Sequence, residues 1–218
     1  FTDSYAVGNG TILDISAACR PLSQGQFGQY PLYVFCTDGT WALATNAEGS
    51  YSSVSPVSRD LYNQSSNIAQ TDTGVVFPSE RGIMLLNGSQ LQCISESINC
   101  RFPFDPFSLP YLPEAARLFG IRNAQASSLD FRDFIKTSSI HYDYADQRLI
   151  FCRRDLSLAF VYSLRSGHWA TMDCDFTYSV NAYPQSLAAG DTFIYDFSDP
   201  LQQEIPALLV TRPLSLDA

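Results

Sequence analysis

The chain has 218 residues, of which 45% are hydrophobic and only 16% are charged, so it can bury the core of one large domain or two smaller ones. Its formal net charge of −9 opposes non-specific binding to phosphate backbones, which argues against a nucleic-acid-binding protein. No apolar run is long enough for a membrane-spanning helix, and Phe1–Tyr5 has neither an initiator Met nor a signal pattern, so we expect a soluble piece of a longer protein.

The first predicted element is a β-hairpin in which two apolar runs flank an Asp-Gly turn. The runs are Tyr33–Cys36 and Thr40–Leu43, and Gly39 supplies the positive φ angle that a tight turn demands. Trp41, in the second run, is expected to be largely buried between sheets.

A second hairpin with the same pattern is predicted further along the chain. Its strands are Val75–Phe77 and Ile83–Leu86, with Gly82 at the turn between them and Gly88 in the Asn-Gly turn that follows. Glycine suits these turns because it has no Cβ to oppose a positive φ angle.

An inserted loop and helical segment is expected over residues 103–135. Prolines interrupt its aromatic beginning, and two short helical pieces follow, Pro113–Phe119 and Leu129–Ile135, the second with Ser128 as its N-cap. Insertions between repeats are natural places for contacts with neighbours, so this segment is a candidate interaction surface. Its candidate contact residues are large apolar side chains, namely Phe104, Phe107, Tyr111, Leu118 and Phe119.

Two further hairpins are predicted after the insertion. The third combines Arg148–Cys152 with Ala159–Leu164, and a Ser-Gly turn leads on to a strand that contains Trp169, which is also expected to be largely buried. The fourth opens as Thr192–Phe197 after a Gly-Asp pair.

The spacing of these hairpins indicates a repeat. If the inner strands begin at residues 33, 75, 149 and 192, the intervals are about 42, 74 and 43, and the long one equals a normal period plus the insertion. A period of about 40 to 45 residues is typical of four-stranded β-propeller blades. The predicted fold class is therefore all-β, with about four propeller-like blades over residues 1–218, as one domain or as part of a larger propeller.

Each hairpin is followed by a stretch that ends in Arg and often Pro, and we expect these stretches to be outer strands. Val54–Arg59 follows the first hairpin, Ile98–Pro103 the second and Leu208–Ser215 the last, which echoes Ala18–Ser23 near the start. Proline cannot donate to a β-ladder, so an edge strand or its exit is the place where it fits.

The six cysteines are too sparse for a disulfide scaffold, and no spacing completes a zinc site. Cys36 and Cys152 each end an apolar strand-like run, which predicts buried free thiols that act as small hydrophobic side chains. A Cys93–Cys100 bridge is the alternative if the protein is exported. No metal and no other cofactor are expected.

The sequence carries no complete catalytic pattern. His141 and His168 lie outside every hydrolase or deaminase motif, and we interpret them as structural or surface residues. Two carboxylate pairs could serve glycosidase chemistry, but aspartates are common in turns because they hydrogen-bond to the backbone. We therefore predict a non-enzymatic protein. The candidate pairs are Asp143 with Asp146 and Asp173 with Asp175.

A resemblance to a known family rests on the first two hairpins and the segments around them. The stretches that carry it are Cys19–Phe35, Gly39–Leu43, Pro56–Asp60 and Val76–Gly88, and Thr211–Asp217 resembles a point at which another sheet segment follows. Together they resemble the propeller-containing tail proteins, of the hub, nozzle or stabilisation type, of short-tailed bacteriophages, including crAss-like phages and related prophages.

The resemblance implies a structural role in assembly. The expected partners are other copies of the chain and neighbouring tail or virion proteins, and the expected location is the virion tail, assembled in the cytoplasm of the bacterial host. Two alternatives stay open. One is a secreted or cell-surface β-propeller that binds glycans or proteins, and the other is a propeller glycoside hydrolase.

Overall fold

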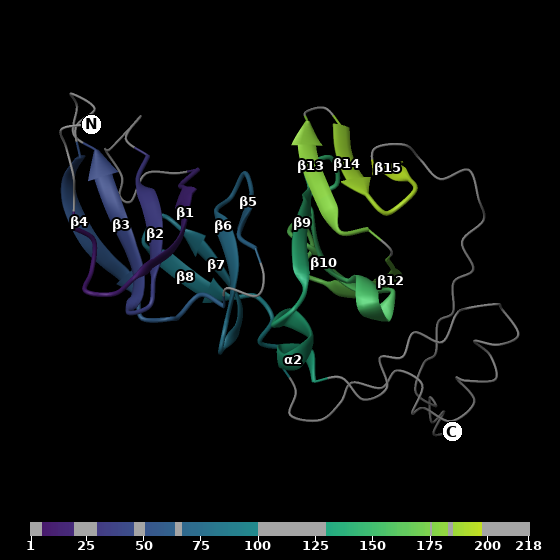
Figure 1. The fold of residues 1–218 in the computed structure, drawn as a ribbon, viewed down its shortest axis with the longest axis horizontal. Coiled ribbons are helices and arrows are strands. Elements are labelled where there is room, and N and C mark those ends of the chain that lie inside the picture. Colours follow the sequence, from purple (N-terminus) through teal and green to yellow (C-terminus); the bar gives the residue numbers. More distant parts are fainter. Residues whose placement is uncertain are drawn as a thin grey trace, which may run out of the picture.

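The computed structural model describes residues 6–19, 30–45, 51–63, 67–99, 130–174, 176–182 and 185–197. These residues form four antiparallel β-sheets that follow one another along the chain (Figure 1). In each sheet the strands lie in the same order in space as in the sequence, as in the blades of a propeller. The predicted all-β, blade-like fold class is therefore confirmed.

The strands have the following bounds. The first sheet consists of β1 (Ile12–Ala17), β2 (Leu32–Cys36), β3 (Gly39–Thr45) and β4 (Tyr51–Ser58). The second consists of β5 (Ala69–Gln70), β6 (Val75–Ser79), β7 (Gly82–Asn87) and β8 (Gln90–Cys93). The third consists of β9 (Ser139–Asp143), β10 (Arg148–Arg153), β11 (Leu158–Ser163) and β12 (Trp169–Asp173), with the 3-10 helix η3 (Arg154–Leu156) between β10 and β11. The fourth consists of β13 (Tyr178–Ala182), β14 (Gln185–Ala189) and β15 (Ile194–Asp196).

Successive sheets pack face to face, and each interface has its own hydrophobic cluster. In β6, Val75 and Phe77 belong to the cluster shared with the first sheet, whereas Val76 belongs to the cluster shared with the third. Because side chains alternate along a strand, a strand that is buried on both faces must be apolar throughout. The continuous apolar runs of β2, β6 and β10 therefore follow from the stacking of the sheets.

The short helix α2 (Phe131–Ile135) contributes to the cluster between the second and third sheets. Phe134 is fully buried, and its ring meets the ring of Phe160 edge to face at 4.9 Å between centroids. Phe131 meets Trp169 in the same manner at 5.4 Å. The helix thus fills space between two blades with aromatic side chains. It lies between β8 and β9, where the interval between repeats is longest (Figure 1).

The turn glycines have the positive φ angles that the hairpin pattern predicts. The φ angles are 138° at Gly39, 127° at Gly82 and 60° at Gly88. At Gly39, a Cβ atom would lie 2.5 Å from the carbonyl oxygen of Ser58, so a side chain there would also clash with the backbone. The carbonyl of Gly88 accepts a hydrogen bond of 2.6 Å from the hydroxyl of Tyr33, which ties this turn to the first sheet.

The two tryptophans are largely buried, as predicted, although Trp41 packs on the outer face of the first sheet rather than between two sheets. Trp41 packs against the small cluster around Val34, and its indole N–H donates to Asp38 at 3.2 Å. Trp169 packs against the cluster between the second and third sheets, and its indole N–H donates to the carbonyl of Ile94 at 3.3 Å. Both rings bury one part while their N–H groups reach polar partners near the surface.

The register predicted for the fourth blade is wrong. The second strands of the four sheets begin at residues 32, 75, 148 and 185, so the last equivalent strand is β14, and Thr192–Phe197 contains β15, the third strand of its sheet. β14 has small and polar side chains, whereas the following run is rich in aromatic and β-branched residues. The stronger strand signal therefore came from the neighbouring strand.

The prediction of outer strands is correct for the first blade, where β4 is the fourth strand and contains Pro56. It is wrong for the second, because β8 is the fourth strand there and Ile98 lies in the turns after it. Short polar turns follow β8 at once, so a strand has no room to form at Ile98. The segments 20–23, 100–103 and 208–215 lie outside the described residues.

The inserted segment is described only from residue 130 onward. The N-cap of α2 is Asp130, whose side chain accepts a hydrogen bond of 2.8 Å from the backbone N–H of Arg132, so the predicted start of the helix at Leu129 is wrong. Asp is as good an N-cap as Ser, and it stands two residues later. The predicted N-cap, the first predicted helix and the candidate contact residues lie outside the described residues, namely Ser128, Pro113–Phe119, Phe104, Phe107, Tyr111, Leu118 and Phe119.

Candidate functional site

The candidate functional site is the outward face of the fourth sheet, which we define by Tyr178, Leu187, Ala189 and Ile194. Tyr178 pairs with Ala189, and Ala189 pairs with Ile194, so the three form one row across β13, β14 and β15. Tyr195 packs against the cluster shared with the third sheet, and its neighbour Ile194 therefore points the other way. Tyr178 is 74% exposed and Ile194 is 76% exposed, so this face presents apolar side chains to solvent.

The side of the fourth sheet that faces the third sheet is held by a buried histidine. His141 on β9 is 3% exposed, with the Ser139 hydroxyl oxygen 2.7 Å from its Nε2 atom and the Ser179 hydroxyl oxygen 2.6 Å from its Nδ1 atom. Phe176 meets the ring edge to face at 4.9 Å. Burial lowers the pKa of His141 to about 4, so the imidazole is neutral near pH 7.

This Ser-His-Ser arrangement joins two blades rather than forming a nucleophilic centre. A catalytic serine needs a histidine that substrate can approach and a carboxylate that orients the ring. Here both ring nitrogens meet serine hydroxyls, one from β9 and one from β13, and the ring is enclosed by protein. His168, the other histidine, is exposed.

Protonation of His141 is expected to weaken the fold. Its pKa is about 4 in the folded state and about 6.5 when unfolded, so the unfolded state binds more protons between these values. The stabilisation is fully present above about pH 6.5 and is lost as the pH falls towards 4, by up to about 3 kcal/mol. Urea unfolding at a series of pH values should show this loss in the unmodified chain but not in His141→Asn.

His168→Asn is the matched control for this measurement, because that ring is exposed. It should keep the pH dependence of the unmodified chain. An identical slope between pH 5 and 6.5 in the unmodified chain and in His141→Asn would contradict the assignment.

Two carboxylates that the sequence singles out do come together, but around an arginine. Asp143 is fully buried and accepts hydrogen bonds from the Nε and Nη2 atoms of Arg148 at 2.9 and 2.7 Å. Asp146 lies 2.6 Å from the same Nη2 atom. The guanidinium therefore bridges the two carboxylates and fixes the turn between β9 and β10. In the second pair, the side chain of Asp173 and all of Asp175 lie outside the described residues.

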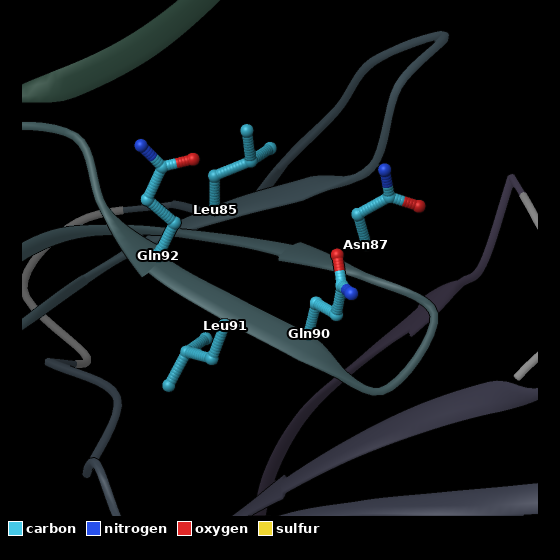
Figure 2. Close-up of a pocket in the computed structure, with 5 residues that line it drawn as sticks. All are labelled: Leu85, Asn87, Gln90, Leu91 and Gln92. Carbon is cyan, nitrogen blue, oxygen red and sulfur yellow. The ribbon is translucent and has the colours of Figure 1, made fainter.

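A small pocket of 390 Å³ lies on the hairpin of β7 and β8 (Figure 2). Figure 2 shows the carboxamides of Asn87, Gln90 and Gln92 around it, together with the side chain of Leu85. Such a lining offers uncharged donors and acceptors, which suits a neutral ligand with hydroxyl or amide groups. No sequence motif marks these residues, although Gln90 and Gln92 alternate with Leu91 in the pattern of an exposed strand.

The cysteines differ from the prediction at one position. Cys152 forms a disulfide with Cys174, with 6.3 Å between the Cα atoms, so the prediction of a free thiol at Cys152 is wrong. The partners are 22 residues apart and meet because β10 and the residue after β12 lie in the same blade, which spacing alone does not reveal. Cys36 is a buried free thiol, as predicted, and Cys93 is free. Cys100 lies outside the described residues.

The described residues contain no cluster of three or more His, Cys, Asp or Glu side chains that could hold a metal ion. Within the same ranges, no helix is long and apolar enough to cross a membrane.

The described part of the chain thus defines an all-β protein of propeller-like blades. No protein-family model and no curated protein sequence matches it. Among solved structures, the chain is similar to the one named the AfRom2 CNH domain, with 10% identical residues and a TM-score of 0.39. The alignment covers 87% of this chain and 51% of that one, so the chain spans about half the length of that structure.

Proposed function

We propose that this chain is a non-enzymatic structural module of a short-tailed bacteriophage tail, of the hub, nozzle or stabilisation type. The observation that supports an assembly role is the stack of sheets, which share three hydrophobic clusters, while none of the clusters formed by the described residues covers the outward face of the fourth sheet. A tail component needs a rigid body and a surface that contacts its neighbours. The stretches that resemble tail proteins provide most of the two middle strands of each of the first two sheets, namely β2, β3, β6 and β7.

The rigidity of the stack follows from its aromatic contacts. Between the first and second sheets, Phe35 meets Phe77 edge to face at 4.9 Å and lies 5.7 Å from the ring of Tyr62. Phe35 and Phe77 are fully buried. Close-packed interiors of this kind resist deformation, so the sheets keep fixed positions relative to their neighbours. This property suits a platform on which other subunits assemble.

The chemistry of the described residues supports the same proposal. The buried ionisable side chains that the sequence singled out as catalytic candidates serve structural contacts, His141 between two blades and Asp143 in a turn. A glycoside hydrolase needs two carboxylates that face a substrate. Asp143 and Asp146 face Arg148 instead, so this pair does not favour the hydrolase alternative.

The proposal is tested on particles released by the organism that encodes the chain. An antibody raised against the purified chain should label the tail in negatively stained particles, and chemical cross-linking should connect it to other virion proteins. Recovery of the chain in the cell envelope or the culture medium, with none in purified particles, would overturn the proposal.

The alternative is a secreted or cell-surface β-propeller that binds glycans or proteins, and two observations favour it. Disulfides such as Cys152–Cys174 persist in oxidising compartments and are rare in the cytosol. The amide-lined pocket on β7 and β8 suits a neutral sugar. Under the tail proposal, the disulfide forms after particles leave the host cytoplasm. Binding of neutral oligosaccharides, lost in Gln92→Ala and kept in the control Gln185→Ala, would favour the alternative.

A further inference from the structure

The interface between the third and fourth sheets is built differently from the other two. Large rings fill those two, such as Phe35 with Phe77 between the first and second sheets and Phe134 with Phe160 between the second and third. Among the described residues, the cluster between the third and fourth sheets is the smallest, and Cys and Ala make up four of its six buried members. Small side chains bury little apolar area, so this interface gains less from hydrophobic burial than the others.

A disulfide bridge lies in this small cluster. It joins Cys152, on β10, to Cys174, which directly follows β12 in the segment that leads to the fourth sheet. Phe176, two residues further on, and Ala188, on β14, belong to the same cluster. The bridge therefore fixes the beginning of the fourth sheet to the face of the third sheet on which the fourth sheet packs.

Both cysteines of the bridge are enclosed by protein. Cys152 is 2% exposed, Cys174 is 4% exposed and Ala188, which packs in the same cluster, is 1% exposed. Thiol–disulfide exchange requires a thiolate to reach one of the sulfur atoms of the bridge. Because the fourth sheet packs over the bridge, a thiol in solution can reach the sulfur atoms only after that sheet has moved away.

Reduction changes the space that the two cysteine side chains need. Two thiols cannot approach each other as closely as two bonded sulfur atoms, so breaking the bond moves the sulfurs apart. They do so inside a cluster that Phe176 and Ala188 close. Close-packed interiors tolerate a local increase in volume poorly. The reduced chain should therefore hold the fourth sheet less firmly than the oxidised chain.

The other contacts between the third and fourth sheets are polar. The imidazole Nδ1 atom of His141, on β9, lies 2.6 Å from the hydroxyl oxygen of Ser179, on β13. At the surface, Arg154 forms an ion pair with Asp191. Exposed ion pairs stabilise a fold only slightly, because water and salt screen them. The bridge is the covalent contact at this interface, and its loss leaves a small cluster and a few polar contacts.

We propose that the Cys152–Cys174 bridge is a redox lock on the fourth sheet, which is held firmly on the third sheet when the bridge is intact and detaches more readily when the bridge is reduced. The two effects are reciprocal. Docking of the fourth sheet holds the two cysteines with their Cα atoms 6.3 Å apart, and the bond in turn favours the docked sheet.

A low-molecular-weight disulfide, such as glutathione disulfide, is the oxidant that closes the lock. The thiolate of one cysteine attacks a sulfur atom of the oxidant, releases one glutathione and forms a mixed disulfide. The thiolate of the other cysteine then attacks the protein sulfur of the mixed disulfide and releases the second glutathione. The two cysteines lose two electrons and two protons, and the oxidant gains both as two thiols.

The time at which the lock closes rests on the proposed function. The host cytoplasm keeps thiols reduced, whereas released particles meet oxidising conditions. The fourth sheet is then loosely held during tail assembly and locked in the finished particle. An alkylating reagent should label Cys152 and Cys174 in host cells before lysis but not in released particles, and labelling in both would contradict this timing.

Hydrogen exchange of the full chain, followed by mass spectrometry, tests the lock itself. Dithiothreitol should raise the exchange rate at least about tenfold in β13–β15 and much less in β2, β3, β6 and β7. The double variant Cys152→Ala, Cys174→Ala should exchange fast in β13–β15 with and without the reductant. The control Cys93→Ala keeps the bridge and should respond as the unmodified chain does. The comparison of the oxidised and reduced chain needs no substitution, so it does not depend on whether a variant folds.

The rate of reduction gives independent evidence. If the bridge reacts only after the fourth sheet has opened, the rate should reach a plateau as the dithiothreitol concentration rises, because opening then limits the reaction. A bridge that the reductant reaches while the sheet is docked would instead be reduced at a rate proportional to the dithiothreitol concentration.

Three results would overturn the inference. They are unchanged exchange in β13–β15 after reduction, an equal increase in all four sheets, and a reduction rate that stays proportional to the dithiothreitol concentration. The proposed function is judged separately, by where the chain is found. A lock in a chain that is absent from particles would stand while the function falls, whereas a chain in phage tails that does not respond to reductant would keep the function and lose the lock.

Discussion

Replacing Phe134 with Ala is expected to lower the free energy of unfolding by about 3–5 kcal/mol, as truncation of a buried Phe does in other cores. Phe134 is fully buried in α2, with the ring of Phe160 at 4.9 Å and the guanidinium of Arg153 at 5.8 Å from its centroid. A helix of five residues is not stable alone, so the lost contacts are those that hold it between the second and third sheets.

Urea unfolding followed by circular dichroism measures this change. Phe193→Ala is the matched control, because Phe193 is 65% exposed and its truncation should change the free energy by at most about 0.5 kcal/mol. Equal effects of the two substitutions would show that α2 does not contribute to the core between these sheets.

Removal of the disulfide is expected to cost about 3 kcal/mol. The bridge between Cys152 and Cys174 closes a loop of 22 residues, and a loop of this length restricts the unfolded chain by about that amount. Thermal unfolding with and without dithiothreitol should show a lower melting midpoint for the reduced chain. The double variant Cys152→Ala, Cys174→Ala should match the reduced chain and should not respond to the reductant.

Cys93→Ala is the control for this measurement, since Cys93 has a free thiol and its removal leaves the bridge intact. Its melting midpoint should still fall on reduction. If reductant leaves the midpoint of the unmodified chain unchanged, both thiols are free and the original sequence prediction for Cys152 is correct.

The parts of the fold that could be predicted from the sequence are those that local chemistry determines. The Asp-Gly and Arg-Gly turns identify two hairpins, because Gly39 and Gly82 can adopt the positive φ angle that each turn requires. The apolar runs of β2, β6 and β10 identify strands buried on both faces. Together they are enough to indicate stacked antiparallel sheets.

The parts that could not be predicted depend on pairing between distant residues. β14 has weak strand propensity and is held in the sheet by pairing with β13 and β15. The stronger strand pattern at Thr192–Phe197 was therefore predicted to be the inner strand of the fourth blade, a position that β14 occupies. The partner of Cys152 also depends on the three-dimensional path of the chain. Local sequence patterns do not carry this information.

The same reason explains why the candidate site was not predicted. A sheet face is defined by the register of its strands, and a shift of one residue moves every side chain to the opposite face. Without β14, the sequence could not show that Tyr178, Ala189 and Ile194 form one row. The site predicted instead, in the inserted segment, depended on a general property of insertions between repeats, and it stays a prediction.

The stacking of the sheets has a consequence for how the molecule loses structure. When interactions are limited to nearest neighbours, an interior unit is held by two interfaces and a terminal unit by one. The fourth sheet has one hydrophobic interface within the described residues, whereas the second and third have two each. Local unfolding should therefore start at a terminal sheet, such as β13–β15, before it reaches the second and third sheets.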